Sequence, residues 1–265
     1  MRTNPLTPDI LIKTLKRSSL PTVLVEGKDD FLIYRKFQNK IGARFVSFLG
    51  CGGRNTLLNI YDRKKEFSNK KVMFIADKDM WVFSSVPEKY NDIIFTKGYS
   101  IENDLYEDGQ LFLNEILESN EKERFKIIIN QLILWFAFEV NKIKSEEEYN
   151  TEFSEVTILS KNTFDRELNK FTDNFISKRG KEDADNEIVK KIVDSFVHKL
   201  RGKFIFQIFE LLFQERKNKK GKVTYTKEQL FDLCYTEGIR DKNNETNMNR
   251  LVNELLKFKN YKKNN

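Results

Sequence analysis

The sequence predicts an α/β fold, a parallel sheet flanked by helices, with an α-helical domain appended after it. Strand-like and helix-like segments alternate over about the first hundred residues, which is the order that builds a parallel sheet. The run KVMFIA at 71–76 is almost continuously apolar, as is typical of a strand covered on both faces. Long amphipathic helices rich in Lys and Glu follow residue 102. We therefore assign residues 1–110 to the α/β domain and 111–265 to the helical domain.

Each predicted strand is a short apolar or β-branched run, and each predicted helix carries apolar side chains at helical spacing. The expected strands are 22–25, 43–49, 71–76 and 92–96, with helices at 29–39 and 55–67. The run LILWFAF, inside an interrupted apolar stretch, is expected to be a buried helix. That stretch falls short of the roughly 20 residues that a membrane span needs.

The composition excludes several kinds of site. The chain has 265 residues, a net charge of +7, one His and two Cys. A zinc site or a His-based mechanism has only His198, Cys51 and Cys234 to draw on, and we expect a structural role for His198. Unpaired cysteines and an N-terminus without an apolar signal segment indicate a reduced, cytoplasmic protein without membrane association. Catalytic chemistry would therefore use carboxylates, Lys, Arg and a hard cation.

Carboxylates follow two of the predicted strands. Glu26 comes after the first strand, and Asp77 and Asp79 come after the third. Because functional groups of parallel sheets collect beyond the carboxyl ends of strands, we expect these loops at one edge. Three convergent carboxylates without a nearby His predict a Mg²⁺ or Mn²⁺ site, which suits phosphoryl transfer. An isolated acid pair is common on surfaces, so the prediction depends on this placement.

Glycines cluster in the loops after the first two strands. Gly27 follows Glu26, and the run GCGG at 50–53 precedes Arg54. One interpretation is that these glycines only form turns, since glycine readily adopts positive φ. The other is that the backbone approaches a phosphate, with Arg54 at a helix start adding charge. The sequence leaves both interpretations open.

Basic side chains near these motifs are candidates for contacts with phosphate, although Lys is mostly exposed and solvated in proteins. They are Lys28, Lys78, Lys97, Arg201 and Lys203. Lys203 is the candidate to test, because Gly202 interrupts an apolar helix there without an evident structural need. The basic runs 215–222 and 257–263 could bind a phosphate backbone or could be solvated.

Together these motifs resemble the Toprim domain. The motifs are VEGKDD at 25–30, GGR at 52–54 and DKD at 77–79, in this order. The further motifs KGYSIEN at 97–103 and LRGK at 200–203 resemble one subfamily of Toprim proteins, encoded beside an ABC-type ATPase in bacterial anti-phage operons. Toprim is the catalytic fold shared by topoisomerases, DnaG-type primases and OLD-family nucleases. The resemblance covers about residues 20–110 and one C-terminal motif.

The resemblance implies roles for individual residues. Glu26 would act as general acid/base or metal ligand, Asp77 and Asp79 would hold Mg²⁺ or Mn²⁺, and Glu102 would support the metal. For the family it also implies metal-dependent cleavage of nucleic acid, with transfer RNA as a candidate target. Cleavage would follow release from an inhibitory ATPase partner and homodimerisation.

Two other hypotheses about the function remain. In one, the acids only bind a metal or a partner, and the helical half makes this chain an interaction module. In the other, the chain is a Toprim enzyme acting on DNA, as a nickase or a strand-passing enzyme. Strand passage needs a catalytic Tyr on a separate domain, and the nine Tyr of this chain lie in no recognisable domain of that type. A nuclease is therefore preferred to a strand-passing enzyme.

Overall fold

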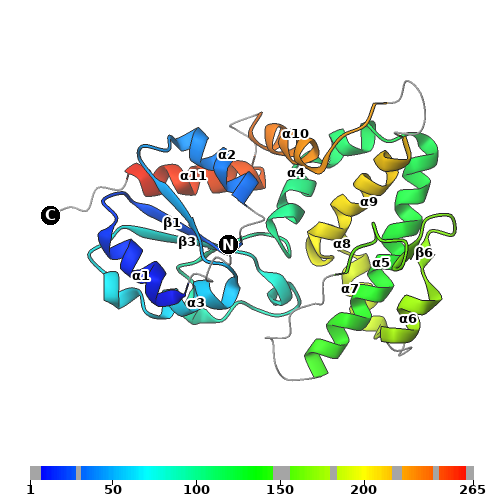
Figure 1. Ribbon diagram of the computed structural model, residues 1–265, viewed down its shortest axis with the longest axis horizontal. Coiled ribbons are helices and arrows are strands. Elements are labelled where there is room, and N and C mark those ends of the chain that lie inside the picture. Colours follow the sequence, from blue (N-terminus) through cyan, green and yellow to red (C-terminus); the bar gives the residue numbers. More distant parts are fainter. Residues whose placement is uncertain are drawn as a thin grey trace, which may run out of the picture. The chain divides into compact units, whose positions relative to one another are not determined.

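A computed structural model describes most of the chain (Figure 1). The described residues are 7–27, 31–145, 156–179, 184–216, 223–240 and 245–260. The chain forms two compact units, of which the first comprises Met1–Lys78, Ser85–Lys97 and Gly238–Asn265, and the second Asp79–Ser84 and Gly98–Glu237. These units differ from the division at residue 110, which falls inside helix α4 (Ile101–Glu115). In the described part of the chain, no helix has the length and apolar composition that a membrane crossing requires.

The first unit contains the predicted parallel sheet. Its four strands have the order β2-β1-β3-β4, and all three neighbouring pairs are parallel. They are β1 (Thr22–Val25), β2 (Ser47–Gly50), β3 (Val72–Ala76) and β4 (Ile94–Phe95). Val25, the last residue of β1, pairs with Gly50 on one side and Ile75 on the other. The carboxyl ends of the central strands therefore end at the same level, which confirms an α/β fold with a parallel sheet.

Helices cover the sheet of the first unit on both sides. In Figure 1, β1 and β3 lie between α1 (Pro8–Arg17) and α3 (Arg54–Asp62) on one side, and α2 (Phe31–Ile41) and α11 (Asn247–Asn260) on the other. The 3-10 helices η1 (Lys64–Phe67) and η3 (Glu88–Tyr90) complete the described helices of this unit. The apolar side chains of β1 are fully buried beneath them.

Helix α11 joins the first unit although it is the last described element of the chain. It packs against α2, and Lys259 Nζ donates to the carbonyl of Ile41 at 2.8 Å. Lys71 Nζ donates in turn to the carbonyl of Lys259 at 3.3 Å. The expectation that the C-terminal segment belongs to a helical domain was therefore wrong for this helix, because its apolar face is buried against the α/β unit.

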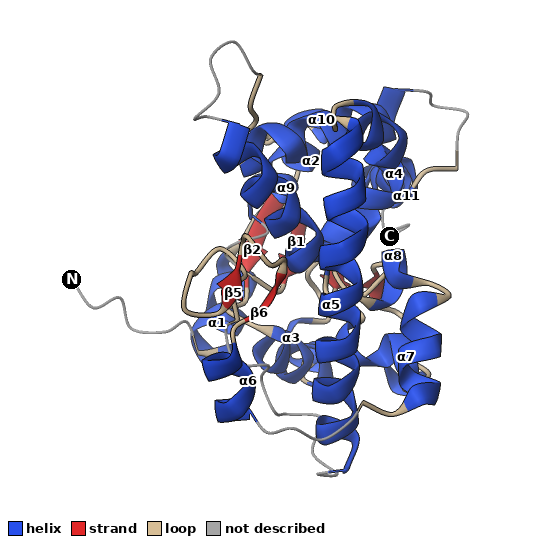
Figure 2. Ribbon diagram, turned by 90° about the vertical axis from the view of Figure 1, so that its right-hand side faces the viewer, coloured by secondary structure: helices blue, strands red, loops and turns tan. Residues whose placement is uncertain are grey.

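The second unit is mainly helical, as expected (Figure 2). Its longest helix is α5 (Ser119–Ser145), with 27 residues. The other described elements are η2 (Asp79–Phe83), α4, α6 (Asp173–Arg179), α7 (Asn186–Val193), α8 (Phe196–Lys199), α9 (Gly202–Arg216), most of α10 (Lys227–Arg240) and the hairpin β5 (Phe164–Asp165) and β6 (Lys170–Phe171). The sequence analysis did not predict this hairpin, because its strands are too short to show alternation.

Aromatic rings form much of the core of the second unit. Trp135 and Phe136 on α5 are 6% and 0% exposed, which confirms the predicted buried run. The ring of Phe204 on α9 lies 5.3 Å from that of Trp135 and 6.3 Å from that of Phe136, edge-on to both. Edge-to-face pairs of this kind add to the stabilisation from burial.

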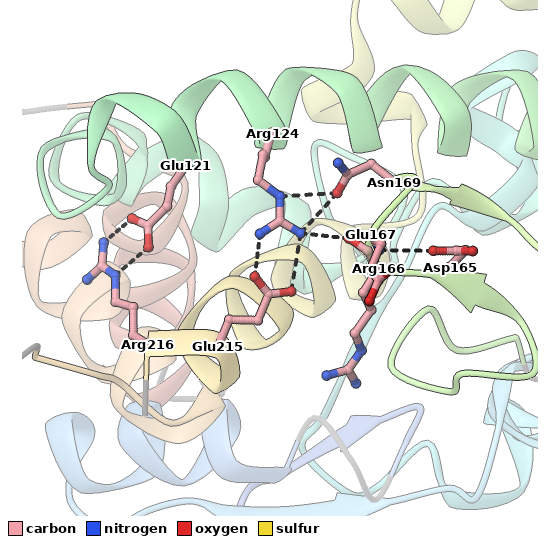
Figure 3. A network of polar contacts seen from close by, with 8 residues as sticks. All are labelled: Glu121, Arg124, Asp165, Arg166, Glu167, Asn169, Glu215 and Arg216. Atoms are coloured by element: carbon pink, nitrogen blue, oxygen red, sulfur yellow. Dashed lines mark hydrogen bonds and ion pairs between the residues drawn. The ribbon is translucent and has the colours of Figure 1, made fainter. Parts of the chain in front are cut away.

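Two ion pairs attach the end of α9 to α5 (Figure 3). Glu121 pairs with Arg216, and both side chains are less than a tenth exposed. Arg124 pairs with Glu215, and its guanidinium also donates to Asn169 Oδ1 at 3.0 Å. The first two residues of the basic run 215–222 are therefore not a solvated segment, because they end a helix and form ion pairs, Glu215 with the part-buried Arg124 and Arg216 with the buried Glu121. Residues 217–222 lie outside the described residues.

Candidate functional site

Glu26 and Asp77 meet at the carboxyl ends of β1 and β3. Each residue directly follows its strand, and the two strands are parallel neighbours. The backbone N–H of Asp77 donates to Glu26 Oε1 at 3.0 Å, and both residues are part-buried. Two acidic residues that the sequence separates by a pair of βα units are thus neighbours at one edge of the sheet, joined by a backbone-to-carboxylate hydrogen bond.

The glycine-rich loop after β2 contacts the same place. Gly52 and Gly53 have φ values of +80° and +136°, which residues with a side chain rarely adopt. The N–H of Gly53 donates to the carbonyl of Glu26 at 2.9 Å. These contacts support the interpretation that the glycines form a tight turn. A Cβ built on either glycine would meet nothing within 4 Å, so their backbone is also accessible.

Arg54, the first residue of α3, hydrogen-bonds to the loop after β3. Its Nη1 donates to the carbonyl of Asp77 at 3.2 Å and to that of Lys78 at 3.1 Å. A guanidinium that holds two consecutive carbonyls fixes the path of the backbone on which Asp77 is carried. The contacts therefore give Arg54 a positioning role, beside the contact with phosphate that its sequence position predicts.

The thiol of Cys51 lies beneath this edge and is fully buried. Burial, with a smaller contribution from the Glu26 carboxylate, raises the pKa of Cys51 to about 12. Burial also raises the pKa of Cys234, in the second unit, to about 12. Both cysteines are free thiols, and at neutral pH both are protonated and therefore poor nucleophiles.

The lysines predicted to contact phosphate lie in different surroundings. Lys78 donates from Nζ to the carbonyl of Lys97 at 3.1 Å, and its backbone N–H donates to Thr96 Oγ1. Lys97 is exposed. Lys28 lies outside the described residues, as does the end of the basic run 257–263.

Asp79 begins the second unit with an unusual backbone. Its φ is +47°, and its N–H donates to the carbonyl of Tyr99 at 2.8 Å. An aspartate tolerates this left-handed conformation better than most residues do, but it still costs energy. Such strain is found disproportionately at functional sites, where the surrounding structure maintains it.

The second unit brings together the two motifs predicted at 97–103 and 200–203. Glu102 lies in the first turn of α4, where the hydroxyl of Ser100 donates to its Oε2 at 2.7 Å. Gly202 begins α9 and packs directly against Glu102 and Asn103. Gly202 therefore has a structural need that the sequence did not reveal. Lys203 is part-buried, and the backbone carbonyl of Arg201 accepts the N–H of Phe204 at 3.0 Å.

His198 has two partners that the sequence analysis did not identify. Its Nε2 lies 2.9 Å from Glu107 Oε2, and its Nδ1 lies 3.2 Å from Ser195 Oγ. The Ser195 contact is local, whereas Glu107 comes from α4 and could not be paired with His198 from spacing. These contacts fit the structural role expected for His198, since they connect α8 to α4.

The residue types suit a hard cation. Glu26 and Asp77 offer carboxylate oxygens, the ligands that Mg²⁺ prefers, and Asp79 is two positions further along the chain. Within the described residues, no group of three or more His, Cys, Asp or Glu side chains is arranged to hold a metal ion. By donor type, Glu26 and Asp77 are therefore candidate ligands, and the described side chains provide no third ligand grouped with them.

Comparison with known proteins adds no identification: no family model and no curated protein matches this chain. The functional argument therefore depends on the residues and contacts described above.

Proposed function

We propose that this protein is a metal-dependent nuclease of the Toprim type, which cleaves phosphodiester bonds of nucleic acid. The observation that carries the proposal is the meeting of Glu26 and Asp77 at the ends of two parallel strands, where the Asp77 N–H donates to Glu26 at 3.0 Å. This placement supports the carboxylate site that the sequence motifs predict. The sequence has a single His, which favours a mechanism based on carboxylates and a metal ion over one based on His.

Each candidate residue would have a separate role in this reaction. Glu26, Asp77 and Asp79 would hold Mg²⁺ or Mn²⁺, with Glu102 in support, and Glu26 is also the candidate general acid/base. When bound, such an ion supplies charge stabilisation to the phosphoryl oxygens and lowers the pKa of a bound water. Arg54 fixes the backbone of Asp77 and Lys78.

Basic side chains would bind the phosphate backbone of the substrate. Arg201 and Lys203 stand on either side of Gly202, the first residue of α9, Lys78 follows β3, and Arg54 is the first residue of α3. Lys28, two positions after Glu26 in the sequence, is the remaining candidate. Lys203 is the candidate to stabilise the negative charge that develops on the phosphate during cleavage.

The finer proposal comes from the resemblance. The motifs are similar to those of AriB, the nuclease effector of the PARIS anti-phage defence system. We propose that RNA, and transfer RNA in particular, is the substrate. We also propose that an ABC-type ATPase partner holds the chain inactive and that the released chain acts as a homodimer.

The test of catalysis uses the full chain with two isosteric variants, Glu26→Gln and Asp77→Asn. The purified proteins are incubated with transfer RNA, total RNA and plasmid DNA, with and without Mg²⁺ or Mn²⁺. We expect each variant to lower the cleavage rate by about 1000-fold, since metal sites contribute several kcal/mol to the barrier. The matched control is Glu88→Gln, which removes an exposed acid of the same unit. Full activity in either site variant would contradict the proposal.

To test control by a partner, this chain and the ABC-type ATPase are expressed together in cells. The cells are then infected with phage, and their RNA is sequenced. Cleaved transfer RNA that disappears with Glu26→Gln supports the proposed substrate. Broken DNA with intact RNA would indicate an OLD-type DNA nuclease instead. Partner binding without any cleavage would indicate an interaction module.

A further inference from the structure

Asn103 makes a set of hydrogen bonds that uses both ends of its amide. The residue is fully buried in the first turn of α4. Its Nδ2 donates to the carbonyls of Val197 at 2.6 Å and Leu200 at 2.7 Å. Its Oδ1 accepts the N–H of Ser100 at 3.0 Å and lies 3.1 Å from the Ser100 hydroxyl. A single buried side chain thus joins residues that are almost a hundred positions apart.

Two glycines, Gly98 and Gly202, pack closely against Asn103. A Cβ on Gly98 would lie 2.5 Å from Asn103 Cβ, and a Cβ on Gly202 would lie 2.7 Å from the Asn103 N and Oδ1 atoms. The added Cβ of Gly202 would also lie 2.8 Å from Glu102 Cβ. Distances this short do not occur in real structures, so neither position accepts a side chain without a backbone shift. The start of α9 is therefore held in direct contact with Glu102.

Further contacts hold the same segment in place. The N–H of Tyr99 donates to the carbonyl of His198 at 2.7 Å. Glu107, four residues after Asn103 and on the same face of α4, lies 2.9 Å from the His198 ring. The segment from Val197 to Leu200 is thereby bound to α4 along its length, and the next residues are Arg201, Gly202 and Lys203.

We propose that Asn103 is a positioning residue, which holds the start of α9, with Arg201 and Lys203 on either side of Gly202, against α4 and orients Glu102 through Ser100. The proposal rests on the proposed nuclease function, in which Glu102 supports the metal and the two basic residues contact phosphate. Groups that hydrogen-bond a metal-supporting carboxylate fix its orientation, and their loss typically costs about 10–100-fold in metal affinity or activity.

The test compares two variants of the motif with one control in the full chain. Asn103→Ser removes both donors to the carbonyls of Val197 and Leu200, and Gly202→Ala keeps every hydrogen-bonding group but is expected to move α9 away from Glu102. The control, Arg124→Gln, breaks the ion pair at the other end of α9. For each protein we would measure the melting temperature, the affinity for Mn²⁺ by calorimetry, and kcat and KM for RNA cleavage.

If Asn103 positions the site, both motif variants weaken Mn²⁺ binding and lower kcat by about 10-fold. The control then loses thermal stability while its Mn²⁺ affinity and kcat stay within about twofold of the wild type. If the motif variants lose stability but keep the wild-type Mn²⁺ affinity and kcat, Asn103 is only structural and the inference is overturned. Should Asn103→Ser not fold, Gly202→Ala decides by the same measurements.

The proposed function can fail separately. A wild-type chain that binds Mn²⁺ but cleaves no nucleic acid would contradict the nuclease, while the Mn²⁺ affinities would still decide the role of Asn103. A wild-type chain that binds no Mn²⁺ would overturn both the metal assignment and the inference.

Discussion

Polar side chains serve different purposes in the strand-end loops of the first unit and in the interior of the second. At the strand ends, Glu26 and Arg54 are part-buried and bind the backbone of residues 77 and 78. In the second unit, Glu121 and Arg216 are buried and bind each other. The first arrangement fixes a loop and keeps charged groups near solvent, whereas the second connects two helices. In the proposed function the strand-end loops carry the chemistry, whereas the Glu121–Arg216 pair serves the fold.

The energetic consequences of the two arrangements also differ. A buried ion pair recovers the cost of removing two charges from water only while both partners are present. A part-exposed side chain that donates to backbone carbonyls leaves those carbonyls accessible to water when it is removed. Loss of one partner should therefore cost more stability in the second unit than in the first.

The largest expected effect is on stability, in Arg216→Leu. This change leaves the Glu121 carboxylate buried without its guanidinium, and we expect the free energy of unfolding to fall by about 3–5 kcal/mol. Urea denaturation followed by circular dichroism measures it. The control Arg63→Leu removes an exposed partner of Asp9 and Glu66 in the first unit, where little change is expected. Equal losses in the two variants would break the comparison.

A second variant tests whether the strand-end loops serve activity more than stability. Arg54→Met removes the hydrogen bonds to the carbonyls of Asp77 and Lys78. We expect a stability loss of about 1 kcal/mol, together with a fall in kcat for RNA cleavage of about 10-fold. Denaturation and cleavage assays on the same preparation separate the two effects. A wild-type kcat in this variant would show that the hydrogen bonds from Arg54 to the carbonyls of Asp77 and Lys78 have no part in the proposed chemistry.

The smallest expected effect concerns Glu210, a part-buried acid of α9. Burial raises its pKa above the ordinary value of 4.5, with Lys227 acting in the opposite direction. Because the folded pKa is raised, the protonated form favours the folded state, and this stabilisation is lost as the pH rises above 4.5 toward the folded pKa. Glu210→Gln should therefore raise Tm by about 1 °C at pH 7, a small value because solvent screens the site.

The Glu210 measurement is a series of melting curves between pH 4 and pH 8. The Tm advantage of Glu210→Gln over the wild type should shrink toward pH 4, where the wild-type carboxyl is protonated. The same Tm difference at both ends of this range would show that the substitution acts through packing instead of charge.

The sequence predicted the sheet well because its strands are locally encoded. The strand at Thr22–Val25 has the predicted bounds, and the strands at Val72–Ala76 and Ile94–Phe95 lie within the predicted ranges. The meeting of Glu26 with Asp77 followed from the rule that parallel strands end at one edge. Such inferences need only local patterns and a known topology.

Other features depend on contacts between distant segments. The packing of α11 against α2, the partner of His198 and the need for glycine at position 202 each involve residues far apart in the chain. Asn103 was part of a recognised motif, but its amide is explained only by the carbonyls of Val197 and Leu200. No local pattern predicts which carbonyl a buried amide will meet.

By itself, the sequence determined the parallel α/β fold, the mainly helical second part and the candidate carboxylates at the strand ends. These follow from periodicity and from the positions of charged residues relative to apolar runs. Only the tertiary structure decided that α11 belongs to the first unit and that Glu215 and Arg216 end a helix and form ion pairs. It alone also decided that Asn103 connects α4 to the start of α9. The reason is physical: a buried polar group must find a partner, and chain folding decides which distant residue is within reach.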